Sequence, residues 1–285
     1  MRTINTTHKA AYEPIGDLVT YRAMPTKTFA MNRLDPFIFL NHHGWQTYPP
    51  HNEGLPFGPH PHRGFETVTF ILEGDLTHKD SHSGESIIKA GGIQWMTAGS
   101  GLVHAEVSSN EFRQKGGPLE ILQLWINLPA RYKMVAPKYV GLQKDELPVL
   151  QIAPGITADL ISGNWQGTEG AVQPLTEIHL AKIDFKQYGH AYFNVPTDNN
   201  ILLYIVKGQI KVNQVPVPYR HLVEFKHDAA GIVMEPEGEA VALFGYARPL
   251  NEPFVASGPF VMNTKEEIVQ AIDDYNKGKF GLMEV

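Results

Sequence analysis

The chain has 285 residues, 42% of them hydrophobic, and its 30 Asp and Glu against 24 Lys and Arg give a net charge of −6. This acidic balance, with no run of basic residues, argues against direct nucleic-acid binding through phosphate neutralisation. The complete lack of cysteine excludes disulfides, thiolate metal sites and cysteine nucleophiles.

The length exceeds that of one ordinary hydrophobic core, so two domains are expected. The 26 Gly and 21 Pro are spread among short β-branched and aromatic runs, a distribution that favours sheets joined by turns and an all-β fold. Residues 1–11 lack the apolar region of a secretion signal, and no later stretch reaches the length of a membrane span. We therefore expect a cytoplasmic protein that does not bind membranes.

Taken in order, residues 20–39 contain short apolar runs broken by Pro25 and Pro36, which suit strands. Residues 41–59 are rich in His, Pro, Gly and aromatic side chains and are predicted to form a long loop. Residues 65–74 are predicted to be a strand that ends at Gly74, with Asp75 to His78 as its hairpin partner.

The clearest alternating strand of this half covers residues 119–128, and residues 130–144 are predicted to be a connector. The second half of the chain repeats part of this pattern. Residues 70–76 (FILEGDL) match residues 204–210 (YIVKGQI) in type, position by position, which suggests a duplicated β-domain.

The repeat also allows a comparison of candidate ligand positions. Counting from the turn glycines places Asn194 and Pro196 where the first half has His60 and His62. Ala242 and Phe244 stand where it has His104 and Glu106. The second domain is therefore predicted to lack a metal site.

One convincing helix closes the chain. Thr264 and Glu267 have the spacing of a capping box, and Lys277 followed by Gly278 is a stop signal. Ile268, Ile272 and Tyr275 are expected on one face, which would pack on the outside of a barrel.

Two pairs of polar residues are the strongest functional signal. Side chains two apart on a strand point to the same face, so His60 and His62 form one pair and His104 and Glu106 the other. If the pairs face each other, three imidazoles and one carboxylate converge, a ligand set typical of catalytic metal sites. Glu66 lies four residues beyond His62 and is an alternative carboxylate.

Eight of the thirteen histidines lie between His42 and His104. His42, His43 and His51 are expected in the long loop, while His78 and His82 are expected at the surface by a hairpin turn. The remaining four downstream histidines are assigned to structure, and Trp95 and Trp125 to the core. We find no nucleophile elbow, phosphate loop or dinucleotide fingerprint in a strand-to-helix context.

These residues resemble a known family. Gly54, His60-Pro61-His62, Glu66 and Gly74 are similar in spacing to the first cupin motif, and residues 99–104 resemble the second. Residues 60–69 and 94–106 are similar to the signature blocks of pirins.

The resemblance implies a bicupin, two stacked antiparallel β-barrels of jelly-roll type with a C-terminal helix. The implied ranges are a metal-binding N-terminal barrel (1–135), a linker (136–148), a C-terminal barrel without metal (149–262), and a helix and tail (263–285). It implies one iron ion held by His60, His62, His104 and Glu106. The same donors also suit Mn, Ni, Cu or Zn.

The resemblance implies two alternative functions. Some pirins are similar to quercetin 2,3-dioxygenases, which cleave a flavonol with O₂ and release carbon monoxide. In that case the substrate is quercetin or a related polyphenol, and Glu106 serves as a metal ligand and general base. Other pirins are iron-dependent regulators that bind transcription factors or metabolic enzymes, which would require a protein partner and no turnover.

Overall fold

The computed structural model of the protein describes residues 1–186 and 188–283. It contains two compact units. The first, called here the histidine-rich unit, comprises Tyr12–Arg22, Ile38–Asp145 and the residues from Leu250 onward; the second unit comprises Met1–Ala11, Ala23–Phe37 and Glu146–Pro249. The predicted ranges treat each domain as one run of sequence, whereas each unit collects three segments. Residues 284 and 285 of the predicted tail lie outside the described residues.

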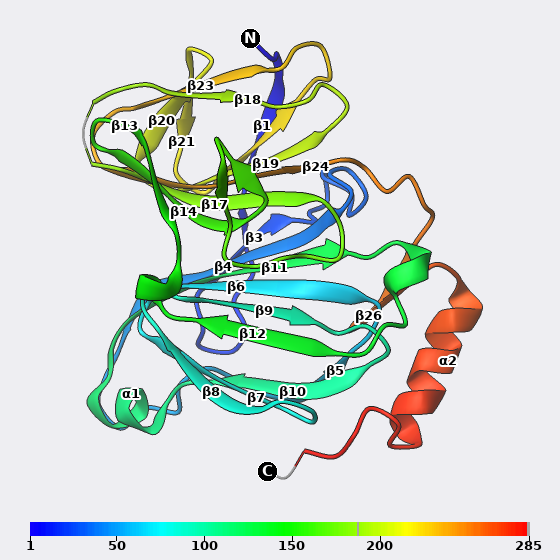
Figure 1. Cartoon of the computed structure of the whole chain (residues 1–285). Helices are drawn as coiled ribbons and strands as arrows, with labels where there is room; N and C mark the ends of the chain where they lie inside the picture. The colour runs from blue at the N-terminus through cyan, green and yellow to red at the C-terminus, as the bar shows by residue number, and fades with distance from the viewer. Residues whose placement is uncertain (187, 284–285) are drawn as a thin grey trace. The chain divides into compact units, whose positions relative to one another are not determined.

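The histidine-rich unit is built from two antiparallel sheets (Figure 1). The larger has the strand order β12-β9-β6-β11-β4-β3-β2, and the smaller has the order β5-β10-β7-β8. The larger sheet consists of β2 (Ala11–Tyr12), β3 (Thr20–Met24), β4 (Phe37–Tyr48), β6 (Phe65–Glu73), β9 (Ile93–Thr97), β11 (Gly117–Asn127) and β12 (Lys138–Leu142). The smaller consists of β5 (Phe57–His62), β7 (Asp75–Asp80), β8 (Gly84–Lys89) and β10 (Leu102–Val107). Outside these sheets lie the hairpin β25 (Val255–Ser257) and β26 (Phe260–Met262), α1 (Asn110–Lys115), α2 (Lys265–Asn276), and the 3₁₀ turns η1 (Ala130–Tyr132) and η2 (Lys144–Glu146).

Apolar side chains of both sheets meet at one end of this unit. Ile71 and Ile121 from the larger sheet pack with Leu76 and Ile88 from the smaller one, and all four are buried. Each such side chain contributes about 1.5–3 kcal/mol by leaving water. The two sheets are therefore held face to face.

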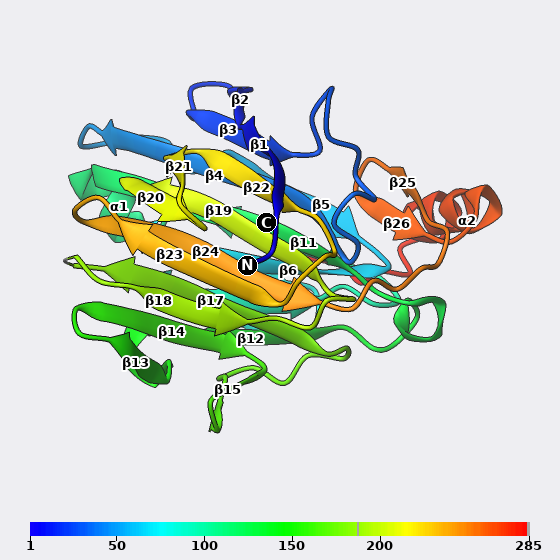
Figure 2. The same ribbon diagram turned by 90° about the horizontal axis from the view of Figure 1, so that it is seen from above.

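The second unit has the same two-layer plan. Its larger sheet has the order β1-β22-β19-β24-β17-β14-β13, with β19 and β24 side by side, and its smaller sheet has the order β18-β23-β20-β21 (Figure 2). The strands are β1 (Ile4–Lys9), β13 (Val149–Ala153), β14 (Ile156–Ser162), β17 (Ile178–Phe185), β18 (Ala191–Asn194), β19 (Asn200–Lys207), β20 (Gln209–Val212), β21 (Val215–Pro218), β22 (His221–Phe225), β23 (Gly231–Pro236) and β24 (Ala240–Ala247), with the small hairpin β15 (Asn164–Trp165) and β16 (Thr168–Glu169). Ala242 and Phe244, at the positions that correspond to His104 and Glu106, lie in its apolar core.

Two local predictions are wrong. Asp75 to His78 is not the hairpin partner of the preceding strand, because β6 pairs with β9 and β11 whereas β7 pairs with β8 and β10. Gly74, at φ +83°, turns the chain from one sheet into the other. The predicted loop over residues 41–59 is also largely strand, because β4 continues to Tyr48 and β5 begins at Phe57.

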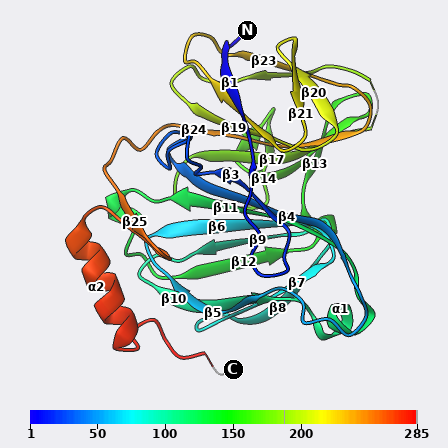
Figure 3. The ribbon, with the colours of Figure 1, turned by 180° about the vertical axis from the view of Figure 1, so that it is seen from behind.

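The C-terminal helix agrees with its predicted signals. Thr264 caps α2, and Glu267 completes the capping box. The predicted packing face is only partly correct. Ile268 is buried together with Ala271 and Asp274, but the prediction is wrong for Ile272 and Tyr275, which are 43% and 39% exposed. The helix lies beside β25 and β26 (Figure 3). The fold is thus all-β with a C-terminal helix, as predicted. Among the described residues, no helix combines the length and apolar character needed to span a membrane.

Candidate metal centre

The first two candidate ligands lie on β5 and the third on β10, which are neighbours in the smaller sheet. In the antiparallel register, His104 lies opposite His60, and Leu102 lies opposite His62. Residues opposite each other in such a pair point to the same face, so alternation along each strand gathers all three imidazoles. The predicted convergence of His60, His62 and His104 is present.

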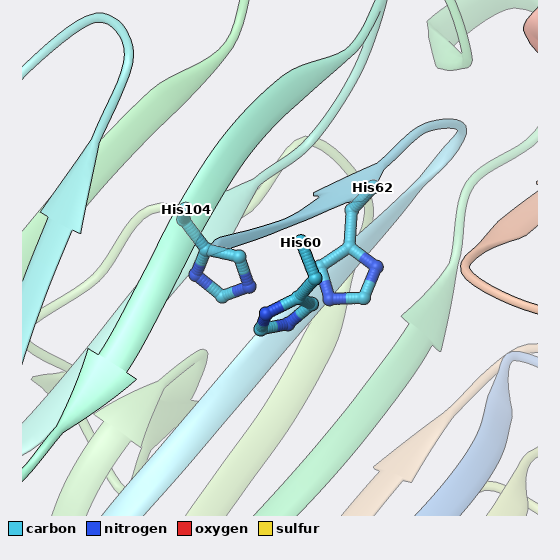
Figure 4. Close-up of side chains that lie close together, drawn as sticks. All are labelled: His60, His62 and His104. Atoms are coloured by element: carbon cyan, nitrogen blue, oxygen red, sulfur yellow. The ribbon is translucent and has the colours of Figure 1, made fainter. Parts of the chain in front are cut away.

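The three rings are close enough to share one ion. Their centroids are 4.3 Å apart for His60 and His104, 4.8 Å for His60 and His62, and 4.9 Å for His62 and His104. One ring nitrogen of each lies within 4.8 Å of the other two, and Figure 4 shows the rings grouped around one point. His62 and His104 are buried, and His60 is half-buried.

The free nitrogens of these rings fit a metal ion. Nδ1 of His60 donates to the carbonyl of Gly58 at 2.8 Å, and Nδ1 of His62 donates to the carbonyl of Pro259 at 3.2 Å. Both contacts place the proton on Nδ1 and leave the Nε2 lone pair free. In the described part of the chain neither ring nitrogen of the buried His104 has a hydrogen-bond partner, which costs about 1–3 kcal/mol for each unsatisfied atom unless a ligand is bound.

The protonation states of His62 and His104 are also those that metal binding requires. Burial, with a smaller effect of the neighbouring His60, lowers the pKa of His62 to about 3. Burial and the adjacent His62 lower the pKa of His104 well below its usual value. Both imidazoles are therefore neutral near pH 7, the form that coordinates metals.

Glu106 lies on β10, one alternation step from His104, but its carboxylate is engaged elsewhere. It accepts hydrogen bonds from Thr69 Oγ1 at 3.1 Å, from Gln123 Nε2 at 2.6 Å, and from the Gln94 side-chain amide. Within the described chain, the group of ligand atoms that share one point contains the three histidines and not Glu106. The structure therefore places Glu106 on the wall beside the histidines, held by amides of the opposite sheet.

Glu66, the alternative carboxylate, faces away from the cluster. The turn at Gly64 separates Glu66 from His62, so Glu66 lies on a different strand, β6. On the same strand, the side chain of Thr69 points to Glu106. Three positions along a strand reverse the face, so Glu66 points to the other side of the sheet. There it accepts a hydrogen bond from Thr97 Oγ1 at 2.6 Å, and burial raises its pKa.

The surface assignment of His78 is wrong. This residue is fully buried, and its ring centroid lies 5.4 Å from that of His104. Its Nε2 contacts Asp80 Oδ2 at 2.8 Å, and its ring stacks on Tyr139 at 4.0 Å. Burial opposes ionisation of Asp80, but hydrogen bonds from His78, Ser83 and His82 lower its pKa overall. The register that places His78 opposite Glu106 could not be read from local sequence.

The loop assignment of His42 and His43 is also wrong, because both are buried in β4. His42 contacts Glu120 at 2.9 Å, and Nδ1 of His43 contacts Thr20 Oγ1 at 2.9 Å. Both are structural residues here, and His51 is exposed.

Aromatic side chains form another wall of the histidine cluster. Trp125, predicted as core, is only half-buried and stacks on Phe39 at 4.4 Å. Its ring lies 5.4 Å from that of His62 in an edge-on arrangement. A separate cavity of about 450 Å³, lined by residues from 15–18 and 46–56, contains none of the three histidines.

Comparisons with known proteins agree with this architecture. A family model described as Pirin matches residues 18–126, and one described as Pirin C-terminal cupin domain matches residues 180–281. The chain is 32% identical over 268 residues to a Pseudomonas aeruginosa protein named "Putative quercetin 2,3-dioxygenase", with 93% of each chain covered. It is 37% identical over 249 residues to a pirin-like protein of Caulobacter vibrioides, which covers 86% of this chain and 87% of that protein.

A solved structure extends the likeness to the whole fold. The crystal structure of quercetin 2,3-dioxygenase from Acinetobacter baumannii superposes with a TM-score of 0.91 at 32% identity, covering 99% of this chain and 100% of that one. The predicted bicupin fold is therefore confirmed. The chain belongs to the pirin family.

Proposed function

We propose that the protein is a metal-dependent dioxygenase that acts on a flavonol such as quercetin or a related polyphenol. The observation that carries this proposal is the convergence of three imidazoles on one point inside the histidine-rich unit, where burial keeps those of His62 and His104 neutral. The likeness to proteins named as quercetin 2,3-dioxygenases supports the reaction class.

His60, His62 and His104 would hold one divalent ion, with Glu106 as the proposed fourth ligand. A bound ion would lower the pKa of a substrate hydroxyl and, if it is redox-active, would supply the chemistry with O₂. Iron is the proposed metal. Because imidazole and carboxylate donors also suit Mn, Ni, Cu and Zn, metal analysis of protein purified without oxygen is needed to identify the ion.

The chain's own residues would orient the substrate and accept its proton. The ring of Trp125, stacked on Phe39 beside His62, offers an aromatic face against which a flat polyphenol would pack. Glu106 would accept the proton of the substrate hydroxyl as general base. To do so, its carboxylate would exchange one of its amide donors, Gln94 or Gln123, for the substrate.

Oxygen uptake and carbon monoxide release with quercetin test this proposal. The wild-type protein loaded with iron should consume O₂ in step with loss of the flavonol absorbance. His62→Ala should abolish turnover, and Glu106→Gln should lower it by a factor of about 10²–10⁴, as expected for loss of a general base. Bound iron without flavonol turnover would contradict the dioxygenase function and leave the metal site standing.

A further inference from the structure

The turn from β5 to β6, residues 62–64, carries His62 and is contacted by a segment from the far end of the chain. That segment, residues 259–280, is called here the C-terminal segment. The Pro259 carbonyl accepts the Nδ1 proton of His62, and the amide of Val261 donates to the Arg63 carbonyl at 3.1 Å. The buried Lys133 ammonium donates to the carbonyls of both Gly64 and Val261, at 2.8 and 2.9 Å. The side chain of His62 and the backbone that follows it are thus tied to the C-terminal segment.

One side chain joins this turn to the segment that leads into β10. The Arg63 guanidinium is buried, and its Nη1 donates to Asp274 Oδ2 on α2 at 2.8 Å. Its Nε donates to the Ser100 carbonyl at 2.7 Å, and its Cζ atom lies over the Phe280 ring, 4.6 Å from the ring centroid. Arg63 is adjacent to His62, and Ser100 is four residues before His104. Arg63 therefore contacts both histidine-bearing segments and the C-terminal segment together.

Phe280 also packs directly on the turn before β10. A Cβ atom at Gly101 would lie 2.6 Å from the Phe280 ring, so this position has room only for glycine. The planar guanidinium of Arg63 is thus contacted by the Phe280 ring, the Asp274 carboxylate and the Ser100 carbonyl. Such a site fixes the orientation of Arg63 and of the two turns bonded to it.

We propose that the C-terminal segment is a positioning element for the metal site, and that it acts through Arg63 and the Pro259 carbonyl on His62 and His104. This inference rests on the proposed metal site. Three imidazoles bind one ion tightly only if their lone pairs meet at one point, and groups that orient a ligand ring commonly change metal affinity 10- to 100-fold. Loosening Arg63 would let both turns move and would spread the nitrogens.

The test compares two neighbouring carboxylates on α2 in the full-length, metal-free protein. Asp274→Asn weakens the contact with Arg63 and nearly preserves side-chain shape. Asp273→Asn is the matched control, since Asp273 pairs with Lys277 at 2.6 Å on the exposed side of the same helix. Affinity for Co²⁺ is measured by competition with a chromophoric chelator, at a temperature where circular dichroism shows each variant fully folded. We expect Asp274→Asn to bind Co²⁺ about 10-fold more weakly, and Asp273→Asn to match the wild type.

Two further readouts separate positioning from general stability. The visible absorption bands of bound Co²⁺ report ligand geometry and should change in Asp274→Asn but not in Asp273→Asn. Arg63→Lys keeps the charge facing Asp274 but loses the planar fork, so its Co²⁺ affinity should fall between those of the wild type and Arg63→Ala. If Asp274→Asn does not fold, Arg63→Lys and Phe280→Leu decide the question.

The outcomes are distinguishable. Wild-type Co²⁺ affinity and spectrum in Asp274→Asn and Arg63→Lys would overturn the positioning role, while loss of binding in His104→Ala would still support the metal site. Failure of the wild-type protein to bind Co²⁺ would overturn both.

Discussion

The side-chain amides of Gln94 and Gln123 both donate hydrogen bonds to the buried carboxyl group of Glu106. Gln123 donates to one oxygen of Glu106, whose side chain is almost completely buried. A buried carboxyl group that loses a hydrogen-bond donor cannot replace it with a hydrogen bond from water. We therefore expect both amides to stabilise the folded site.

Gln123→Leu should lower the free energy of unfolding by about 1–3 kcal/mol, because one oxygen of Glu106 loses its donor. Urea denaturation of the metal-free protein measures the effect. Gln173→Leu is the control, because Gln173 is exposed, and it should change stability by no more than about 0.5 kcal/mol. Equal effects of the two substitutions would show that Glu106 does not depend on Gln123.

His43 predicts a dependence of stability on pH. Burial, followed by the charges of His42 and Arg22, lowers its pKa to about 3 in the folded chain, against about 6.5 in the unfolded chain. Between these values the unfolded chain binds more protons, so stability is lost as pH falls below about 6.5.

From pH 6.5 to 5, the wild type should lose about 2 kcal/mol more than His43→Gln. Urea midpoints of the metal-free proteins at the two pH values give the difference, in which the contributions of the other histidines cancel. An identical pH dependence in both proteins would mean that the pKa of His43 in the folded chain is the same as in the unfolded chain.

At the scale of single residues, alternation predicted which histidines share a face, since it depends only on strand geometry. It could not predict His78 or Trp125 beside them. Those contacts depend on which strand pairs with which and on the packing of one sheet on the other. The same limit applies to Glu106, whose partners Gln94 and Gln123 come from the opposite sheet.

At the scale of elements, the turn between β5 and β6 sets the entry of the chain into the larger sheet. Gly64 there has φ +88°, and a Cβ atom would lie 2.1 Å from the Val261 carbonyl oxygen. Gly84, the first residue of β8, has a similar φ of +94°, with open space around it. A comparison of alanine substitutions at Gly64 and Gly84 therefore separates the cost of backbone strain from the cost of a steric clash.

Gly84→Ala should cost about 1–2 kcal/mol from the left-handed backbone alone. Gly64→Ala should cost about 1–3 kcal/mol more, because the methyl group must displace β26. Thermal or urea unfolding of both variants measures the difference. Equal costs would mean that the Val261 carbonyl moves away without penalty.

Strand positions were largely predictable from composition and alternation, but strand partners were not. Instead of forming the expected hairpin after Gly74, the chain crosses into the other sheet. The local sequence does not distinguish a hairpin from such a crossing. The histidine-containing part of β4 resembled a loop because its first eight residues are all buried, so the two faces show no alternation. A prediction from the alternation of polar and apolar residues cannot recognise polar side chains that are buried with hydrogen-bond partners.

At the scale of the whole molecule, the repeat at residues 70–76 and 204–210 correctly indicated two β-units of one plan. The interior of the second unit is formed by apolar side chains such as Phe244, whereas the histidine-rich unit places polar groups at the corresponding positions. The assignment of Met1–Ala11 to the second unit, and of the chain beyond Leu250 to the histidine-rich unit, was not predictable. Such assignments depend on contacts between residues more than a hundred positions apart.

The central claim is that one metal ion is held by His60, His62 and His104 inside the histidine-rich unit. The most direct test is the metal content of protein expressed with iron and purified without oxygen, measured by elemental analysis for the wild type, His104→Ala and His190→Ala. His190 is the control, since its side chain is 73% exposed. We predict one ion per chain in the wild type and in His190→Ala, and none in His104→Ala. Full metal content in His104→Ala, or no metal in the wild type, would contradict the claim.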